Sequence, residues 1–366
     1  MKRYLTTILL LAALLTSFSA RAQEEKTVSS DTLYVNFLES LDKGDILPFK
    51  YIYQRAKIGI GAVKDTTITS SITKDISFEV LENNKEDHWI HLSVTQENFK
   101  KEGPECNIPY FMSNTCLIGD GTPYEIIVEY NGDLFTNRFL DELLSRYTKN
   151  LDYICDTLSK SSYVDEKLSK EQWEERFSYM RDSSFIMWHA ASDYPDLFFF
   201  GGYGYQADTA YVSIDSLQCD ADHKWYYSNN TFGWDKSFSD SNEDFKDLYV
   251  FRSFERFDPH LVLDNLYSSR NLSKEEMDEL LEKADPRRLF RIINITELAD
   301  KAAGLPILLD KEITAGYYEK VGDDYISVTK ELLALDLEKL VGGDDEDEDE
   351  DEDSPRYDDY GFIKVK

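Results

Sequence analysis

The sequence contains few of the residues that metal and redox sites require. Its 366 residues include five histidines and four cysteines, and no two cysteines stand in a CxxC pair. Structural zinc sites and thioredoxin-like motifs both depend on that close spacing. The cysteine and histidine content therefore predicts neither a metal site nor a bound cofactor.

Signatures of catalysis are also missing. His88 and His91 are three residues apart in a strand-like stretch, so their rings point to opposite faces. The glycines around Gly201 lack the Lys-Ser/Thr pair of a phosphate-binding loop, and no G-x-S-x-G elbow occurs. Asp240 to Asp244 begin like a calcium loop, but Phe245 occupies the position that requires glycine. No catalytic, cofactor-binding or metal-binding residue is assigned, and the sequence favours a non-enzymatic protein.

Basic residues are scarce. The chain has 40 Lys and Arg against 71 Asp and Glu, which gives a formal net charge of −31. Such a surface repels nucleic acids and anionic membranes and attracts cations or basic proteins. We therefore expect no nucleic-acid partner and consider a basic protein partner, although a well-solvated surface is the simpler explanation of the charge.

Only one long apolar run is present, and it lies at the N-terminus. Ile8 to Leu15 follow the positive Lys2 and Arg3, and Ala20 and Ala22 supply an A-x-A cleavage pattern. The run is too short to cross a bilayer, and no cysteine lies at the cleavage point to carry a lipid anchor. Residues 1–22 are thus predicted to be a signal peptide cleaved after Ala22, which places the mature chain in the periplasm or outside the cell without a membrane span.

Export to an oxidising compartment allows disulfides to form. The even number of cysteines leaves three pairings open if all four are bridged. The bond between Cys106 and Cys116 is our first choice, because prolines and glycines around these residues mark a loop that a bridge could close.

Two β-rich regions flank a helical one. Residues 48–98 alternate apolar and polar side chains, as do 289–298, 307–318 and 325–335, which predicts two antiparallel meanders. Apolar spacings of three and four residues predict two amphipathic helices within an insertion at 134–192. The predicted fold is α+β, with a large curved antiparallel sheet made of two meanders and the helical insertion packed on it.

Residues 23–341 are predicted to form a single domain. A short helix is expected near Asp31 to Asp42 at its start, and a strand from Tyr124 to Tyr130 leads into the helical insertion. Residues 342–366 are predicted to be a disordered tail, because Asp344–Asp353 are all acidic and contain no apolar surface to bury. Within that tail, Phe362 to Lys366 alternate apolar and basic residues and could instead dock as a strand.

This order of elements resembles that of uncharacterised exported β-rich proteins of Gram-negative bacteria. More distantly, the strand-turn-strand around Gly304-Leu305-Pro306 resembles the lipoprotein-carrier (LolA/LppX-like) half-barrel families. The resemblance implies a curved sheet that holds helices and an apolar ligand. It carries no functional residues across, and the acidic tail departs from the carrier pattern.

Three functions remain open at this point. The leading hypothesis is an exported non-enzymatic binding protein whose curved sheet encloses an apolar or mixed small molecule, since 24 Tyr and 5 Trp could line such a pocket. The second is a surface interaction or assembly protein that uses the acidic tail. The third is a hydrolase whose site a single sequence does not reveal.

Overall fold

The computed structural model describes residues 32–59, 66–103, 105–130, 134–136, 139–160, 168–191, 200–218, 225–258, 290–302, 304–318 and 324–337, together with a few single residues. The chain divides into two units, Ser30–Leu340 and a second made of Met1–Ser29 and Val341–Lys366. All described residues belong to the first unit. The predicted signal peptide, the acidic tail and Cys219 therefore lie outside the described residues.

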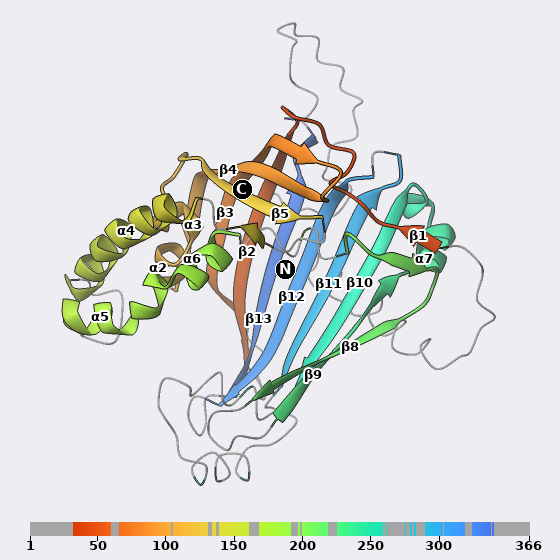
Figure 1. The fold of residues 1–366 in the computed structure, drawn as a ribbon. Helices are drawn as coiled ribbons and strands as arrows, with labels where there is room; N and C mark the ends of the chain where they lie inside the picture. The colour runs from red at the N-terminus through yellow and green to blue at the C-terminus, as the bar shows by residue number, and fades with distance from the viewer. Residues whose placement is uncertain are drawn as a thin grey trace, which may run out of the picture. The chain divides into compact units, whose positions relative to one another are not determined.

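The described unit is built on one curved antiparallel sheet of eleven strands, which confirms the predicted α+β class. Across the sheet the strands follow the order β6-β5-β4-β3-β2-β13-β12-β11-β10-β9-β8, and a second sheet pairs β1 with β7 (Figure 1). The strand bounds are β1 Thr32–Tyr34, β2 Ile46–Gly59, β3 Thr66–Asn84, β4 Trp89–Glu102, β5 Tyr124–Glu129, β6 Leu134–Thr136, β7 Gly204–Gln206, β8 Tyr211–Gln218, β9 Trp225–Trp234, β10 Leu248–Phe257, β11 Arg291–Asp300, β12 Pro306–Tyr318 and β13 Asp324–Leu335.

The two predicted meanders are present and join into one sheet. β2, β3 and β4 form the first, and β11, β12 and β13 form the second. The last strand of the second meander pairs with the first strand of the other, with Leu333 opposite Tyr51 and Leu335 opposite Phe49. The two ends of the domain are thereby fixed to each other by a ladder of main-chain hydrogen bonds.

One face of the sheet carries the hydrophobic core. We call it the core face and define it by Phe49, Phe78 and Phe251, each at most 1% exposed. Alternation along the strands places these side chains on the same side. The ring of Phe200 stacks on that of Phe251 with centroids 5.1 Å apart, and the ring of Phe37 meets it edge-on at 6.1 Å. The segments that contain Phe37 and Phe200 thus close one end of the core face.

The helix expected near Asp31 to Asp42 is absent. β1 occupies Thr32–Tyr34 and pairs with β7, and turns follow it. Val35, Leu38 and Leu41 have helical spacing, and all three are buried in the core. Pairing with a distant strand therefore overrides the local preference for a helix, which is weak in so short a segment.

In the region expected to hold two helices, the described residues form three α-helices and one 3-10 helix. Their bounds are α4 Leu140–Lys160, α5 Lys170–Arg176, η1 Ser178–Arg181 and α6 Ser183–Ala190. Two caps explain the division. Ser169 and Gln172 form a reciprocal capping box that starts α5, and Asp182 accepts hydrogen bonds from the amides of Ser184 and Phe185 to start α6.

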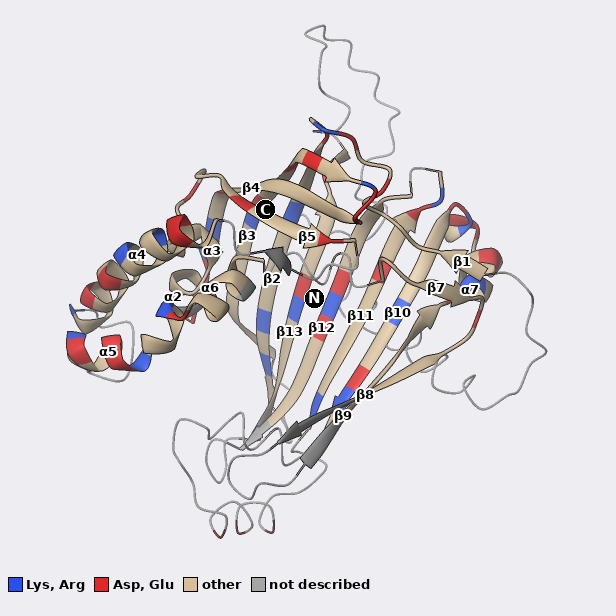
Figure 2. Ribbon diagram, in the orientation of Figure 1, with Lys and Arg blue, Asp and Glu red and all other residues tan. Residues whose placement is uncertain are grey.

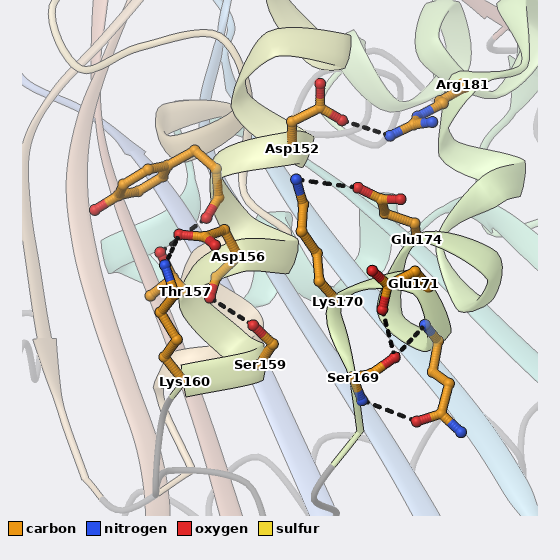
Figure 3. Close-up of polar contacts among 12 residues, drawn as sticks. Asp152, Asp156, Thr157, Ser159, Lys160, Ser169, Lys170, Glu171, Glu174 and Arg181 are labelled. Atoms are coloured by element: carbon orange, nitrogen blue, oxygen red, sulfur yellow. Dashed lines mark hydrogen bonds and ion pairs between the residues drawn. The ribbon is translucent and has the colours of Figure 1, made fainter.

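One surface ion pair joins two of these helical segments, and another lies within a single helix. Arg181 bonds Asp152 of α4 at 2.6 Å, and Lys170 lies 3.4 Å from Glu174 within α5 (Figure 3). Exposed pairs of this kind contribute about 1 kcal/mol or less each, so they orient the helices more than they stabilise them. None of the described helices is both long enough and apolar enough to cross a membrane.

Candidate functional site: the open rows of the core face

The core face extends beyond the packed core. At the edge of the core, one cross-strand row holds Tyr51, Leu333, Leu309, Glu297, Phe251 and Trp234. Leu309, Leu333 and Phe251 of this row are buried, and Tyr51 is half-buried. The next two rows along the strands belong to the same face and are mostly half-buried. We call these two rows the open rows.

The open rows mix apolar and polar side chains. Half-buried aromatic and aliphatic groups alternate with charges and hydroxyls across seven strands (Figure 2 shows the charges on β2, β12 and β13). The first open row consists of Tyr53, Glu331, Lys311, Ile295, Ser253, Phe232 and Tyr211, and the second of Arg55, Thr329, Ile313, Ile293, Glu255, Asn230 and Ser213. Such a surface matches a ligand with both an apolar body and a polar group.

Aromatic side chains lie at both ends of the first open row. At one end, the rings of Tyr211 and Phe232 stack with centroids 5.9 Å apart. At the other end, burial raises the pKa of the Tyr53 hydroxyl, and the nearby charge of Arg55 opposes this shift. Tyr53 therefore stays a neutral hydrogen-bonding phenol at physiological pH.

Two cations of β2, Arg55 and Lys57, contact neighbouring segments. Arg55 donates from Nε to the hydroxyl of Ser327 at 3.3 Å, and Lys57 lies 2.8 Å from the Glu105 carboxylate. Burial alone would raise the pKa of Glu105, but the hydrogen bond and charge of Lys57 hold it below its usual range. Arg55 thus places a positive charge at the β2 end of the second open row.

A buried polar network anchors the helical region to the sheet. Lys74, 5% exposed, donates to Gln96 Oε1 at 3.1 Å and lies 4.6 Å from the ring centroid of Tyr51. Thr115 also donates to Gln96 Oε1, and the Gln96 amide donates to the hydroxyl of Tyr124 at 3.2 Å. Tyr124 in turn donates to a helix carbonyl, that of residue 190, at 2.9 Å.

The network continues between the helices. The side-chain amide of Asn114 donates to the carbonyls of His189 and Ala190 at 2.8 and 3.4 Å. The hydroxyl of Tyr147 lies 2.6 Å from Asn114 Oδ1 and 2.8 Å from His189 Nδ1. Both described partners of the histidine ring are neutral, and Tyr147 is fully buried. This geometry is that of a structural network rather than of a nucleophile and its base.

Sequence reasoning did not identify Lys74. The even spacing of Ile68, Ile72, Ile76, Phe78 and Val80 predicts that they share one strand face. Lys74 is a buried member of that alternation, whereas Ile68 lies beyond the register shift at Ala56 and is 52% exposed. A lysine within a buried alternating stripe is the signal that could have found it, because lysines are rarely buried without polar partners.

The two histidines considered as metal ligands have different surroundings. His91 Nε2 lies 2.7 Å from a Glu125 oxygen, and its ring stacks on Phe139 at 5.0 Å. His88 lies in the turn before β4, with positive φ, and its ring meets Tyr130 edge-on. Among the described residues, no group of three His, Cys, Asp or Glu side chains could hold a metal ion.

The cysteines in the described residues are free. Cys106 and Cys116 flank the short helix α2 (Asn107–Phe111) and carry thiols, as does Cys155 in α4. Burial raises the pKa of Cys116 to about 11. The bond predicted between Cys106 and Cys116 is therefore not formed in this structure, and the pairing stays a prediction for the oxidised protein.

Comparison with known proteins does not identify a family. No family model matches the sequence, and no protein with a curated description does. Among solved structures, one of lipovitellin, described for its lipid-protein interactions, matches with a TM-score of 0.29 and 8% identity over 80% of this chain. This chain spans only a quarter of the length of lipovitellin. Salmonella typhi OmpF in complex with daunomycin matches with a TM-score of 0.22, 8% identity and 80% coverage of this chain, over 97% of its own length. Scores this low do not establish a shared fold.

Proposed function

We propose that this chain is a non-enzymatic binding protein that holds an amphiphilic small molecule against the open rows of the core face. One observation carries the proposal. The face that forms the core continues for two more cross-strand rows, in which aromatic and aliphatic side chains such as Tyr53, Ile313 and Phe232 remain half-exposed. Neighbouring apolar side chains that stay partly exposed, as Ile313 and Ile293 do on paired strands, are typical of a binding surface.

The polar members of the rows define the kind of ligand. An alkyl or ring system would lie along Ile313, Ile293 and Phe232, and its polar group would approach Arg55 and Lys311. The signal peptide predicted at residues 1–22 supports a place outside the cytoplasm, where the ligand would be taken up. Export is part of the proposal.

Binding of a fluorescent fatty acid to the mature chain tests this function. The variant Ile313→Asp places a charge within the second open row, and Thr314→Asp places the same charge one residue along β12 on the opposite face. Both positions are half-buried. We expect Ile313→Asp to raise the Kd about tenfold or more, which corresponds to ~1.4 kcal/mol, whereas Thr314→Asp leaves it near that of the parent chain.

Two results would count against the proposal. The first is the absence of saturable binding by the parent chain, together with no lipid in a solvent extract of the purified protein analysed by mass spectrometry. The second is an equal effect of the two substitutions, since binding would then not depend on the core face. Thermal unfolding of both variants shows whether either has lost its fold.

A further inference from the structure

The two edges of the large sheet differ in how they are protected. β6, at one edge, has three residues, whereas β8, at the other, has eight and pairs with β9 alone. Natural sheets protect an edge with lysine, proline, a bulge or a very short strand. Residues 211–218 contain no lysine or proline, and their pairing with β9 shows no register shift. Among the described residues, β9 is the one strand that pairs with β8, and the other edge of β8 carries no strand.

The face of β8 that points away from the core carries exposed apolar side chains. Val212 is 64% exposed and Ile214 60%, both on the face away from the core. Val212 pairs with Thr231 of β9, which pairs with Phe254 of β10, itself 36% exposed. The backbone edge and an apolar patch of Val212, Ile214 and Phe254 thus lie side by side. We call this combination the β8 edge.

We propose that the β8 edge pairs with the β8 edge of a second copy of this chain, so that the sheets of the two protomers form one continuous sheet. Antiparallel pairing about a two-fold axis at Ser213 places Val212 opposite Ile214 of the partner subunit. The four β-branched side chains then gather on one face, as in stable cross-strand pairs.

Charge limits the places where two copies of this chain can meet, and the β8 edge is one of them. The chain carries a formal charge of −31, so two copies repel each other over most of their surfaces. Tyr211 to Ile214 are uncharged, as are Thr231 and Phe254 beside them, and Asp215 is the one charged residue of β8. The pairing about Ser213 sets that aspartate opposite Tyr211 of the partner subunit and keeps like charges from facing each other.

Sedimentation velocity of the full mature chain over a concentration series tests the pairing. We expect a reversible dimer whose Kd rises about tenfold or more in the double variant Val212→Lys/Ile214→Lys. The matched control is Ile68→Lys, which introduces lysine at a 52% exposed strand position on the same face of the sheet, far along it from β8. The control should dimerise like the parent chain.

A cysteine placed on the axis tests the register. Paired residues have Cβ atoms about 5 Å apart, so Ser213→Cys should form an intermolecular disulfide on mild oxidation, and more of it than Ile214→Cys or the parent chain. A monomer at all concentrations overturns the proposal. So does a dimer that the double lysine variant leaves intact. The Ser213→Cys variant without residues 357–366 gives a third test. If this variant forms the intermolecular disulfide and the full-length Ser213→Cys variant does not, the proposal is overturned, because the chain's own C-terminal segment would then cover the edge.

Discussion

Replacing Asn114 with alanine should destabilise the protein, because this side chain is at the centre of the buried polar network between the helices. Asn114 is 2% exposed, and its side chain bonds the carbonyls of His189 and Ala190 and accepts from the hydroxyl of Tyr147. Each buried hydrogen bond contributes about 1 kcal/mol net, and a buried polar group that loses its partner costs about 1–3 kcal/mol. The carbonyl of residue 190 keeps its bond from Tyr124, so the expected loss is about 2–4 kcal/mol.

Asn150→Ala is the matched control. Asn150 lies in the same helical region but donates one hydrogen bond, to the carbonyl of Leu117 at 2.9 Å, so its loss should cost about 1 kcal/mol. Urea unfolding followed by circular dichroism gives both free energies of unfolding. Equal losses for the two variants, or a loss below about 0.5 kcal/mol for Asn114→Ala, would refute the view that this network anchors the helices to the sheet.

Further predictions concern the backbone, a buried acid and the thiols. Gly103→Ala should lower the free energy of unfolding in urea by about 3 kcal/mol, and Gly44→Ala by about 1 kcal/mol. Both glycines have positive φ, but only at Gly103 would an added Cβ lie 2.6 Å from the Thr69 carbonyl oxygen. Equal losses would argue against that clash. Burial raises the pKa of Asp310 in the folded state, so its contribution to stability is present below the unfolded pKa and is lost as the pH rises through the folded one. Asp310→Asn should therefore raise the Tm at neutral pH, with the gain vanishing below about pH 4, and a gain at every pH would contradict this assignment. Cys116 should resist iodoacetamide at pH 8 until the chain is unfolded, because burial raises its pKa to about 11; a Cys106–Cys116 linked peptide in mass spectrometry would instead support the pairing expected from the sequence.

Alternation along the strands made much of the sheet predictable. Ile76 and Phe78 sit at even spacing, and both are buried on the core face as that spacing requires. The strand expected from Tyr124 is β5, Tyr124–Glu129. β3 has 19 residues and alternates strongly, which is where pattern reasoning is most reliable, whereas β5 is a short strand of six.

The pairing of β2 with β13 was not predictable from periodicity. Periodicity shows which side of a strand is buried but not which strand lies next to it, and Phe49 and Leu335 are brought together only by the folded sheet. For the same reason, periodicity did not predict the open rows. Tyr53, Lys311 and Phe232 come from three strands, and no local spacing connects them.

The buried polar network between the helices and the sheet could not be predicted either, because it depends on tertiary packing. Gln96, Asn114 and His189 are polar residues of ordinary type, and their burial depends on how α3 (Asn114–Leu117) and α6 pack on the sheet. The short helix expected near Asp31 to Asp42 was wrong, because Thr32–Tyr34 pair with β7, a strand about 170 residues further along the chain that no local pattern reveals.

Photo-crosslinking of a diazirine-labelled fatty acid to the mature chain tests the central claim most directly, because it reports the position of the bound molecule. Peptide mapping should place the adducts on the strands of the open rows, at core-face residues such as Tyr53, Ile313 and Thr329, and an excess of unlabelled fatty acid should suppress them. Adducts confined to the opposite face, for example at Val328 or Thr314, or labelling that unlabelled fatty acid does not reduce, would contradict the account.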